Sequence, residues 1–116
     1  MDKKDEVSLR GILKYSMRIE SYMAIINNNK EGFYNNSMLR DAVSMCIQTI
    51  GEYVNDLSND FKSKHVQIPW KDIYNMRNRF AHGYDGMIVD YIWEAATIYV
   101  PELKNYCYGL IETEKK

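Results

Sequence analysis

The chain has 116 residues, of which 46% are hydrophobic and 27% are charged. This length suits one domain with a single modest core, so we expect residues 1–116 to fold as one unit. The formal net charge of −1 excludes a strong overall positive field, so any RNA contact must depend on a local basic cluster. With only two prolines and six glycines, long helices are favoured over a β-sandwich with many turns.

The first predicted helix follows an N-terminus that lacks the apolar run of a signal peptide. No stretch approaches the ~18 apolar residues of a membrane helix, so we expect a cytoplasmic protein without a membrane segment. The helix itself is predicted from apolar residues that alternate spacings of three and four: Ile12, Tyr15, Ile19, Tyr22 and Ile26. Asn27–Asn29 and Gly32 then predict a turn, because short amides and glycine favour turn conformations.

A second and longer helix is predicted from a continuous apolar stripe: Leu39, Val43, Cys46, Ile50, Val54, Leu57 and Phe61. The stripe indicates one helix of about 25 residues, packed antiparallel to its neighbours. Either Asn36 or Ser37 is predicted to cap its start. Residues 62–67 form a polar connection, in which we expect His65 to be solvated.

Two more helical segments complete the predicted architecture. Pro69 can occupy the first turn of the third helix, which carries Trp70, Ile73, Met76 and Phe80 inward. Asp72 suits the positive end of its dipole, and Gly83 is predicted to end it. The fourth stripe is Ile88, Ile92, Ala95, Tyr99, Leu103, Tyr106 and Leu110, and Pro101 makes it a kinked helix or two helices end to end. The prediction is an all-α, up-down bundle of four to five helices, with Cys46 and Cys107 as buried free thiols.

Residues 77–84, with the sequence Arg-Asn-Arg-Phe-Ala-His-Gly-Tyr, are predicted to carry the chemistry. Only an imidazole such as that of His82 titrates near neutral pH without special help. Arg77 and Arg79 can hold a phosphodiester through charge-assisted hydrogen bonds. Asn78 lies four residues before His82 and therefore shares its helix face. An acid–base group beside a phosphate clamp predicts RNA cleavage without a metal.

Each of these residues also has a structural interpretation. Arg79 and His82 fit the last turn of a helix, where cations interact with the dipole and histidine can cap. Tyr84 is one of ten tyrosines and can simply pack against the fourth helix. Glu52 can meet a basic group across the bundle or lie on a solvated flank. We expect no metal and no cofactor, because the chain has no Cys-x-x-Cys, no His-x-x-x-His and no glycine-rich phosphate loop.

The extended motif resembles the signature of the HEPN superfamily, and specifically its HepT-type toxins. The likeness spans about Leu39 to Leu110. Besides Arg77-x4-His82-x-Tyr84 with Asn78, it includes four flanking segments: Ile50-Gly51-Glu52, Trp70-Lys71-Asp72-Ile73, Trp93-Glu94 and Pro101-Glu102-Leu103. Many relatives place a carboxylate four residues after the tyrosine, where this chain has Ile88. Asp90 is the expected substitute, as a helix cap.

The resemblance implies a homodimeric helical bundle that acts as a metal-independent endoribonuclease toxin. It further implies a type VII-like toxin–antitoxin pair, in which the partner is a minimal nucleotidyltransferase antitoxin. In that family the antitoxin can transfer AMP from ATP to the motif tyrosine, which is Tyr84 here.

Two hypotheses about function follow. In the first, the 2′-hydroxyl of the RNA attacks its own phosphodiester. His82 then acts as general acid or base, Arg77 stabilises the phosphorane, and Asn78 orients the imidazole. In the second, the chain is a non-catalytic dimeric helical module that binds a nucleotidyltransferase or a nucleotide. Loss of chelator-resistant RNA cleavage in a His82→Ala variant would separate the two.

Overall fold

The computed structural model describes the backbone of residues 1–82 and 86–114 and the side chains of residues 1–76 and 89–113. All regular elements within these ranges are helical, which confirms the all-α prediction. In chain order they are α1 (Lys3–Ile25), α2 (Lys30–Tyr34), α3 (Ser37–Asp56), α4 (Asn59–Lys64), α5 (Trp70–His82), α6 (Gly86–Glu94), the π-helical turn η1 (Ala95–Tyr99) and α7 (Val100–Glu114).

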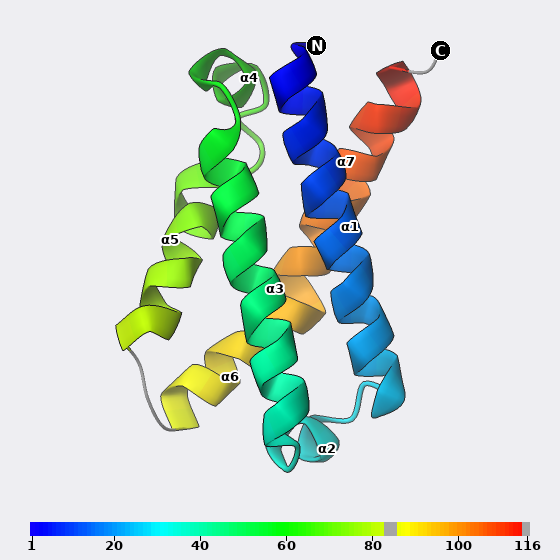
Figure 1. Ribbon diagram of the computed structural model, residues 1–116, viewed down its shortest axis with the longest axis vertical. Helices are drawn as coiled ribbons and strands as arrows, with labels where there is room; N and C mark the ends of the chain where they lie inside the picture. The colour runs from blue at the N-terminus through cyan, green and yellow to red at the C-terminus, as the bar shows by residue number, and fades with distance from the viewer. Residues whose placement is uncertain (83–85, 115–116) are drawn as a thin grey trace.

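The long elements form an up-down bundle (Figure 1). Along the vertical axis of the figure, α1 runs down, α3 runs up, α5 runs down, and the α6–η1–α7 segment runs up. The helix α3 packs between α1 and α5, and α1 packs against α7 on its other side. The two chain ends therefore lie at the same end of the bundle, opposite α2 (Figure 1). This arrangement confirms the predicted topology.

The turn after α1 forms where the asparagine run predicted it. Asn27 and Asn28 have φ angles of 53° and 55°, the left-handed conformation that asparagine tolerates better than most residues. Asn29 then caps a single helical turn, α2, by accepting a hydrogen bond from the N–H of Gly32. The cap of α3 is Asn36, whose side chain accepts from the N–H of Leu39. The short helix α2 was not predicted, because five residues carry too little periodicity.

The prediction of one continuous helix through Leu57 and Phe61 is wrong. The helix α3 ends at Asp56, Leu57 is extended, and α4 begins after Ser58. Ser58 caps α4 through its hydroxyl, and both its N–H and its Oγ donate to the carboxylate of Asp5, each at 2.7 Å. Asp5 comes from the first turn of α1 and is only 3% exposed. A contact 53 residues away in sequence thus stabilises the break.

His65 is not solvated as predicted, but half-buried at the position that directly follows α4. Its Nδ1 lies 2.7 Å from the hydroxyl of Tyr106 on α7, and its ring stacks on Phe61 with the centroids 4.3 Å apart. The indole of Trp70 donates to the carbonyl of His65 at 2.8 Å. Pro69 directly precedes α5 rather than lying within its first turn. These contacts attach the first turn of α5 to α4 and α7.

The predicted interruption at Pro101 takes the form of a π-helical turn. The chain passes from α6 through η1 into α7 without leaving the helical conformation, and Val100 donates to the carbonyl of Ala95 in the wider π pattern. Pro101 has no N–H, and in a regular α-helix its ring would clash with the carbonyl of Thr97. The wider turn immediately before it relieves that conflict. The hydroxyl of Thr97 also donates to the carbonyl of Trp93 at 2.8 Å.

The core lies between α1, α3 and the α6–η1–α7 segment, and it contains both cysteines as buried free thiols, as predicted. Burial raises the pKa of Cys107 from 9.0 to about 12. Burial also raises the pKa of Cys46, an effect that the nearby positive charge of Arg18 partly offsets. None of the helices in the described part of the chain is long and apolar enough to cross a membrane.

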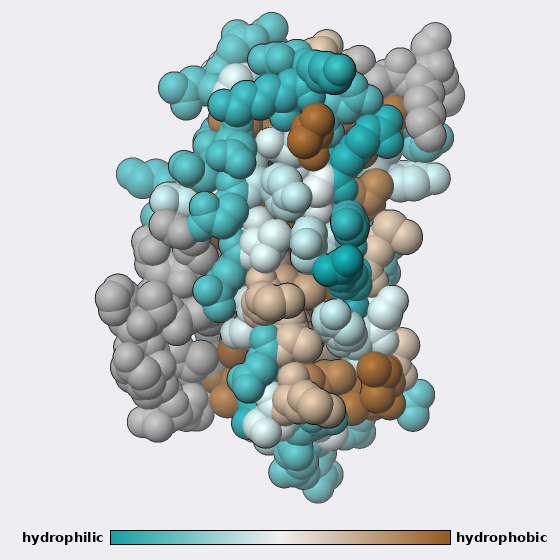
Figure 2. Space-filling view, in the orientation of Figure 1, coloured by the Kyte–Doolittle hydropathy of each residue, from teal (hydrophilic) through white to brown (hydrophobic). Residues whose placement is uncertain are grey.

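One surface of the bundle carries few charged side chains. Figure 2 shows a pale to brown strip that runs down the face formed by α1 and α3 and is bordered by teal, hydrophilic side chains. Large exposed apolar residues on these two helices include Met17, Ile25, Met38 and Met45, and Met38 is 80% exposed. Contiguous exposed apolar surface is typical of sites where another protein binds.

Candidate active site

Residues 77–82 of the motif form the last turns of α5, which extends to His82. The helical backbone through residues 77–82 agrees with the prediction that Asn78 and His82 lie one turn apart on the same helix. Their side-chain positions, the conformation of Gly83 and the predicted turn after it lie outside the described residues. The same holds for the other predicted site residues, which are Arg77, Arg79 and Tyr84.

The described part of α5 shows how the motif is positioned. Trp70 at its first residue is 6% exposed and packs against Phe61 and Tyr106, with ring centroids 5.7 and 6.5 Å apart. Met76, one residue before the motif, is 5% exposed and belongs to the core. Both ends of this stretch are therefore anchored by burial. The motif thus directly follows a part of α5 that packs into the core.

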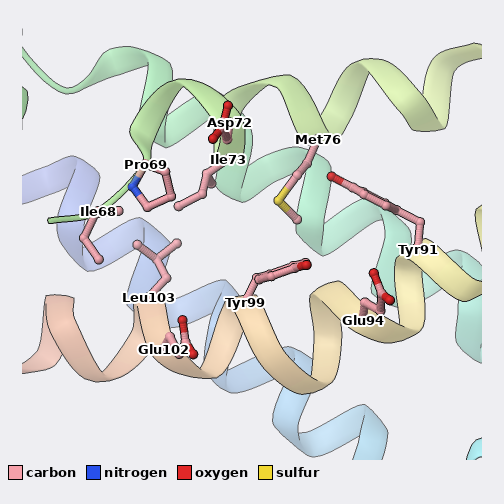
Figure 3. Close-up of a pocket in the computed structure, with 10 residues that line it drawn as sticks. All are labelled: Ile68, Pro69, Asp72, Ile73, Met76, Tyr91, Glu94, Tyr99, Glu102 and Leu103. Carbon is pink, nitrogen blue, oxygen red and sulfur yellow. The ribbon is translucent and has the colours of Figure 1, made fainter. Parts of the chain in front are cut away.

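A pocket of about 380 Å³ lies alongside α5, where it faces α6, η1 and α7 (Figure 3). Its apolar lining comes from both sides: Ile68, Pro69, Ile73 and Met76 before and on α5, and Leu103 on α7. Its polar lining consists of Asp72, Tyr91, Glu94, Tyr99 and Glu102. The lining therefore combines five apolar side chains with five that carry polar groups.

The polar groups are not evenly spread around the pocket. Figure 3 shows Tyr91, Glu94 and Tyr99 together at one end, the end to which Met76 also contributes. Asp72 lies on the α5 side, in the first helical turn, and Glu102 on the α7 side. Within the described residues, no three His, Cys, Asp or Glu side chains come close enough together to hold a metal ion.

The π-helical turn explains why Tyr99 lines the pocket. Glu94 follows Tyr91 by three residues, which is one turn of an α-helix. Tyr99 follows Glu94 by five residues, which is the spacing of the i→i+5 hydrogen bonds in a π-helix. In a regular α-helix, Ile98 would lie closer than Tyr99 to the helix face that carries Tyr91 and Glu94. Sequence reasoning missed this pocket, although Pro101 within a helical stripe was the signal that the register changes here.

The family resemblance also drew attention to residues outside the motif, and the structure shows where several of them lie. Trp93 stacks on Phe33 with the ring centroids 5.4 Å apart and so joins α6 to α2. Asp90 lies in the interior of α6, four residues after its start, so the expectation that it caps this helix is wrong. Caps act only at the first turn, where backbone N–H groups lack partners. Glu52 is exposed on α3.

The comparisons with known proteins agree with this architecture. The profile of the family described as Ribonuclease HepT-like matches residues 12–109. "Putative RNase MJ0125" of Methanocaldococcus jannaschii is 39% identical over 103 residues, covering 83% of this chain and 87% of that protein. "Probable ribonuclease HepT" of Thermococcus cleftensis is 34% identical over 75 residues, covering 65% and 68% respectively. No solved structure gives a significant match. On the strength of the family match and the identity to these relatives, the chain belongs to the HepT-like ribonuclease family of the HEPN superfamily.

Proposed function

We propose that this protein is a metal-independent endoribonuclease that uses the motif on α5. The observation that carries the proposal is the Arg77-x4-His82-x-Tyr84 pattern at the end of an anchored helix, in a chain of a ribonuclease family. The 2′-hydroxyl of the RNA attacks the adjacent phosphorus, and the bond to the 5′-oxygen breaks. The products are a 2′,3′-cyclic phosphate and a 5′-hydroxyl.

The motif residues divide the work of this reaction. His82 accepts the proton of the 2′-hydroxyl or donates one to the leaving oxygen, since an imidazole suits proton transfer near neutral pH. Arg77 stabilises the negative charge that develops on the phosphorane oxygens. Asn78 orients the imidazole or binds a phosphate oxygen, and Arg79 holds the neighbouring backbone phosphate.

We also propose that the active form is a homodimer that works as the toxin of a toxin–antitoxin pair. Two motifs across a two-fold axis can supply both an acid and a base to one scissile bond. The exposed apolar residues on α1 and α3 support association with a second protein chain. Light scattering at micromolar concentration tests the dimer, and a monomeric mass would contradict it.

The decisive experiment is RNA cleavage by the purified protein in excess chelator. We expect the wild type to cut, and both His82→Ala and Arg77→Ala to lose activity while keeping the wild-type circular dichroism spectrum. Lys71→Ala is the matched control, because it removes an exposed charge from the same helix outside the motif. A protein that binds RNA or nucleotide but never cuts would instead support a non-catalytic binding module.

The control point is proposed to be Tyr84, through AMP transfer by a minimal nucleotidyltransferase antitoxin. The added phosphate would compete with RNA for Arg77, and the adenosine would block the site, so activity should fall. Co-expression with a nucleotidyltransferase followed by intact-mass and peptide mapping tests this step, with Tyr84→Phe as the matched control. An unmodified Tyr84 in a neutralised complex would show that inhibition needs binding alone.

A further inference from the structure

We propose that the pocket between α5 and the α6–η1–α7 segment binds one base of the RNA substrate, and that guanine is the base it prefers. This inference rests on the proposed ribonuclease function and adds a recognition site to it. The base enters against Tyr91 and Tyr99, and Glu94 accepts hydrogen bonds from its edge. Four features of the described residues support this assignment: the shape of the pocket, its hydrogen-bonding character, the π-helical turn and its distance from the motif.

The shape and lining of the pocket suit a planar aromatic group. Its volume of about 380 Å³ falls in the range of small-molecule sites. Tyr91 is half-buried and Tyr99 is 42% exposed, so one ring belongs to the wall and the other stands at the mouth. Single-stranded RNA is commonly recognised by stacking its unpaired bases on aromatic side chains. The thioether of Met76 adds a polarisable surface to the same end of the pocket (Figure 3).

The polar lining selects for a base with hydrogen-bond donors. Ionised carboxylates only accept hydrogen bonds, and Glu94 lies at the same end of the pocket as the two phenols. The Watson–Crick edge of guanine presents two adjacent donors, N1–H and the N2 amino group, which match the two oxygens of one carboxylate. Uracil presents one donor between two acceptors, and adenine and cytosine each present a single amino group. A carboxylate therefore discriminates in favour of guanine.

The π-helical turn indicates that this end of the pocket is a built site. Such turns inside α-helices are frequently found at functional sites. Here the turn rotates Tyr99 towards Tyr91 and Glu94 and leaves Ile98 on the surface, 49% exposed. Relief of the conflict at Pro101 explains why a turn exists. The proposed base-binding role uses Tyr99, which this turn brings to the pocket.

The pocket also lies at a suitable distance from the cleavage motif. Met76 lines the pocket, and His82 follows it by six residues on the same helix. At a rise of 1.5 Å per residue the two positions are about 9 Å apart along the axis. A base in the pocket would thus belong to a nucleotide one or two positions from the scissile phosphate. The phosphates themselves would be held by the motif arginines, away from the carboxylates.

Charge repulsion between the pocket and the RNA backbone is limited by exposure. Asp72, Glu94 and Glu102 are all exposed to solvent, where water and salt weaken their repulsion of the RNA phosphates. The same carboxylates would also attract a cationic ligand, such as an arginine side chain or a polyamine. The experiment below includes that alternative as an outcome that would overturn the proposal.

The test uses the full-length protein and short RNAs with a single variable base. We expect kcat/KM to be about tenfold or more higher for a guanine substrate than for an adenine, uracil or cytosine one, as one good bidentate contact provides. Inosine, which lacks the N2 amino group, should give an intermediate value. Glu94→Gln should lower cleavage of the guanine substrate to the level of the other three substrates and so abolish the preference for guanine. Tyr99→Leu should lower cleavage of the guanine substrate, whereas Tyr99→Phe, which keeps the aromatic ring, should cleave it as the wild type does.

Glu6→Gln is the matched control, because it removes the same charge from an exposed position that does not line the pocket. A separate binding measurement uses the His82→Ala protein, which is expected to be inactive, and titrates it with guanosine 5′-monophosphate by calorimetry. Binding that Glu94→Gln weakens about tenfold would support the pocket even if no RNA were cut, a result that refutes only the proposed enzyme function. Cleavage with no base preference, or binding of spermidine in place of the nucleotide, would overturn the inference.

Discussion

Replacement of Asp5 by alanine should destabilise the protein more than any other change to a charged side chain in the described residues. Asp5 is 3% exposed, and its two oxygens accept hydrogen bonds from the N–H and the hydroxyl of Ser58, each at 2.7 Å. The Ser58 hydroxyl in turn accepts from the N–H of Phe61 and caps α4. The variant therefore loses the contact that joins the first turn of α1 to the break between α3 and α4.

The magnitude follows from these contacts. A hydrogen bond to a charged group contributes ~1.5–3 kcal/mol, so the two together contribute roughly 3–6 kcal/mol. Because alanine has no carboxylate, the variant avoids the desolvation cost of burying one, and this offsets part of the lost stability. We expect a loss of about 3 kcal/mol in the free energy of unfolding, a large fraction of the ~5–15 kcal/mol typical of a domain. Asp5→Asn keeps one acceptor and the side-chain volume, and should cost about half as much.

Urea denaturation followed by circular dichroism measures the effect, and the slope m should stay at the wild-type value. Ser58→Ala removes one of the two hydrogen bonds and the cap, at a cost of about 2 kcal/mol. The double variant should be less destabilised than the sum of the single variants, because each change removes the same contact. A loss below about 1 kcal/mol for Asp5→Ala, or additive single effects, would refute the assigned role of this contact.

Three further predictions concern packing and pH. Gly11→Ala should destabilise by about 1–3 kcal/mol, because a Cβ at Gly11 would lie 2.4 Å from the ring of Tyr53; Tyr53→Ala should suppress this cost in a double-mutant urea titration. Above pH 9.0 the Cys107 thiol ionises in the unfolded chain, whereas in the native protein it stays protonated up to about pH 12. The free energy of unfolding should therefore fall as pH rises, by up to about 1.4 kcal/mol per pH unit. Cys107→Ala should remove this component of the pH dependence. Tyr106→Phe should cost about 1 kcal/mol in thermal unfolding through loss of the contact with His65, and an unchanged Tm would contradict it.

The helices themselves could be predicted from the sequence, because local periodicity shows which face of each helix is buried. Ile12 and Ile19 of the first stripe are at most 1% exposed, and Val43 and Val54 of the second are fully buried. The Asn27–Asn29 turn and the cap at Asn36 were also readable. Their causes lie within a few residues of the chain, in backbone conformations and in side chains that bond to nearby N–H groups.

Features caused by distant contacts could not be predicted in this way. The apolar stripe through Leu57 and Phe61 continues across a break, because both residues still face the core although the helix between them is interrupted. Only the approach of Asp5 from α1 makes the break favourable. His65 is likewise half-buried through Phe61 and Tyr106, and the second of these is 41 residues away.

The same distinction between local and distant causes applies to the candidate site. The side chains that we propose to carry the chemistry were chosen from composition and spacing within residues 77–84, since that motif is local in sequence. The pocket beside it was decided by tertiary structure, because its walls come from α5, α6, η1 and α7. Whether Tyr99 or Ile98 faces that pocket depends on one π-helical turn, and a helical stripe specifies a face only as long as the number of residues per turn stays constant.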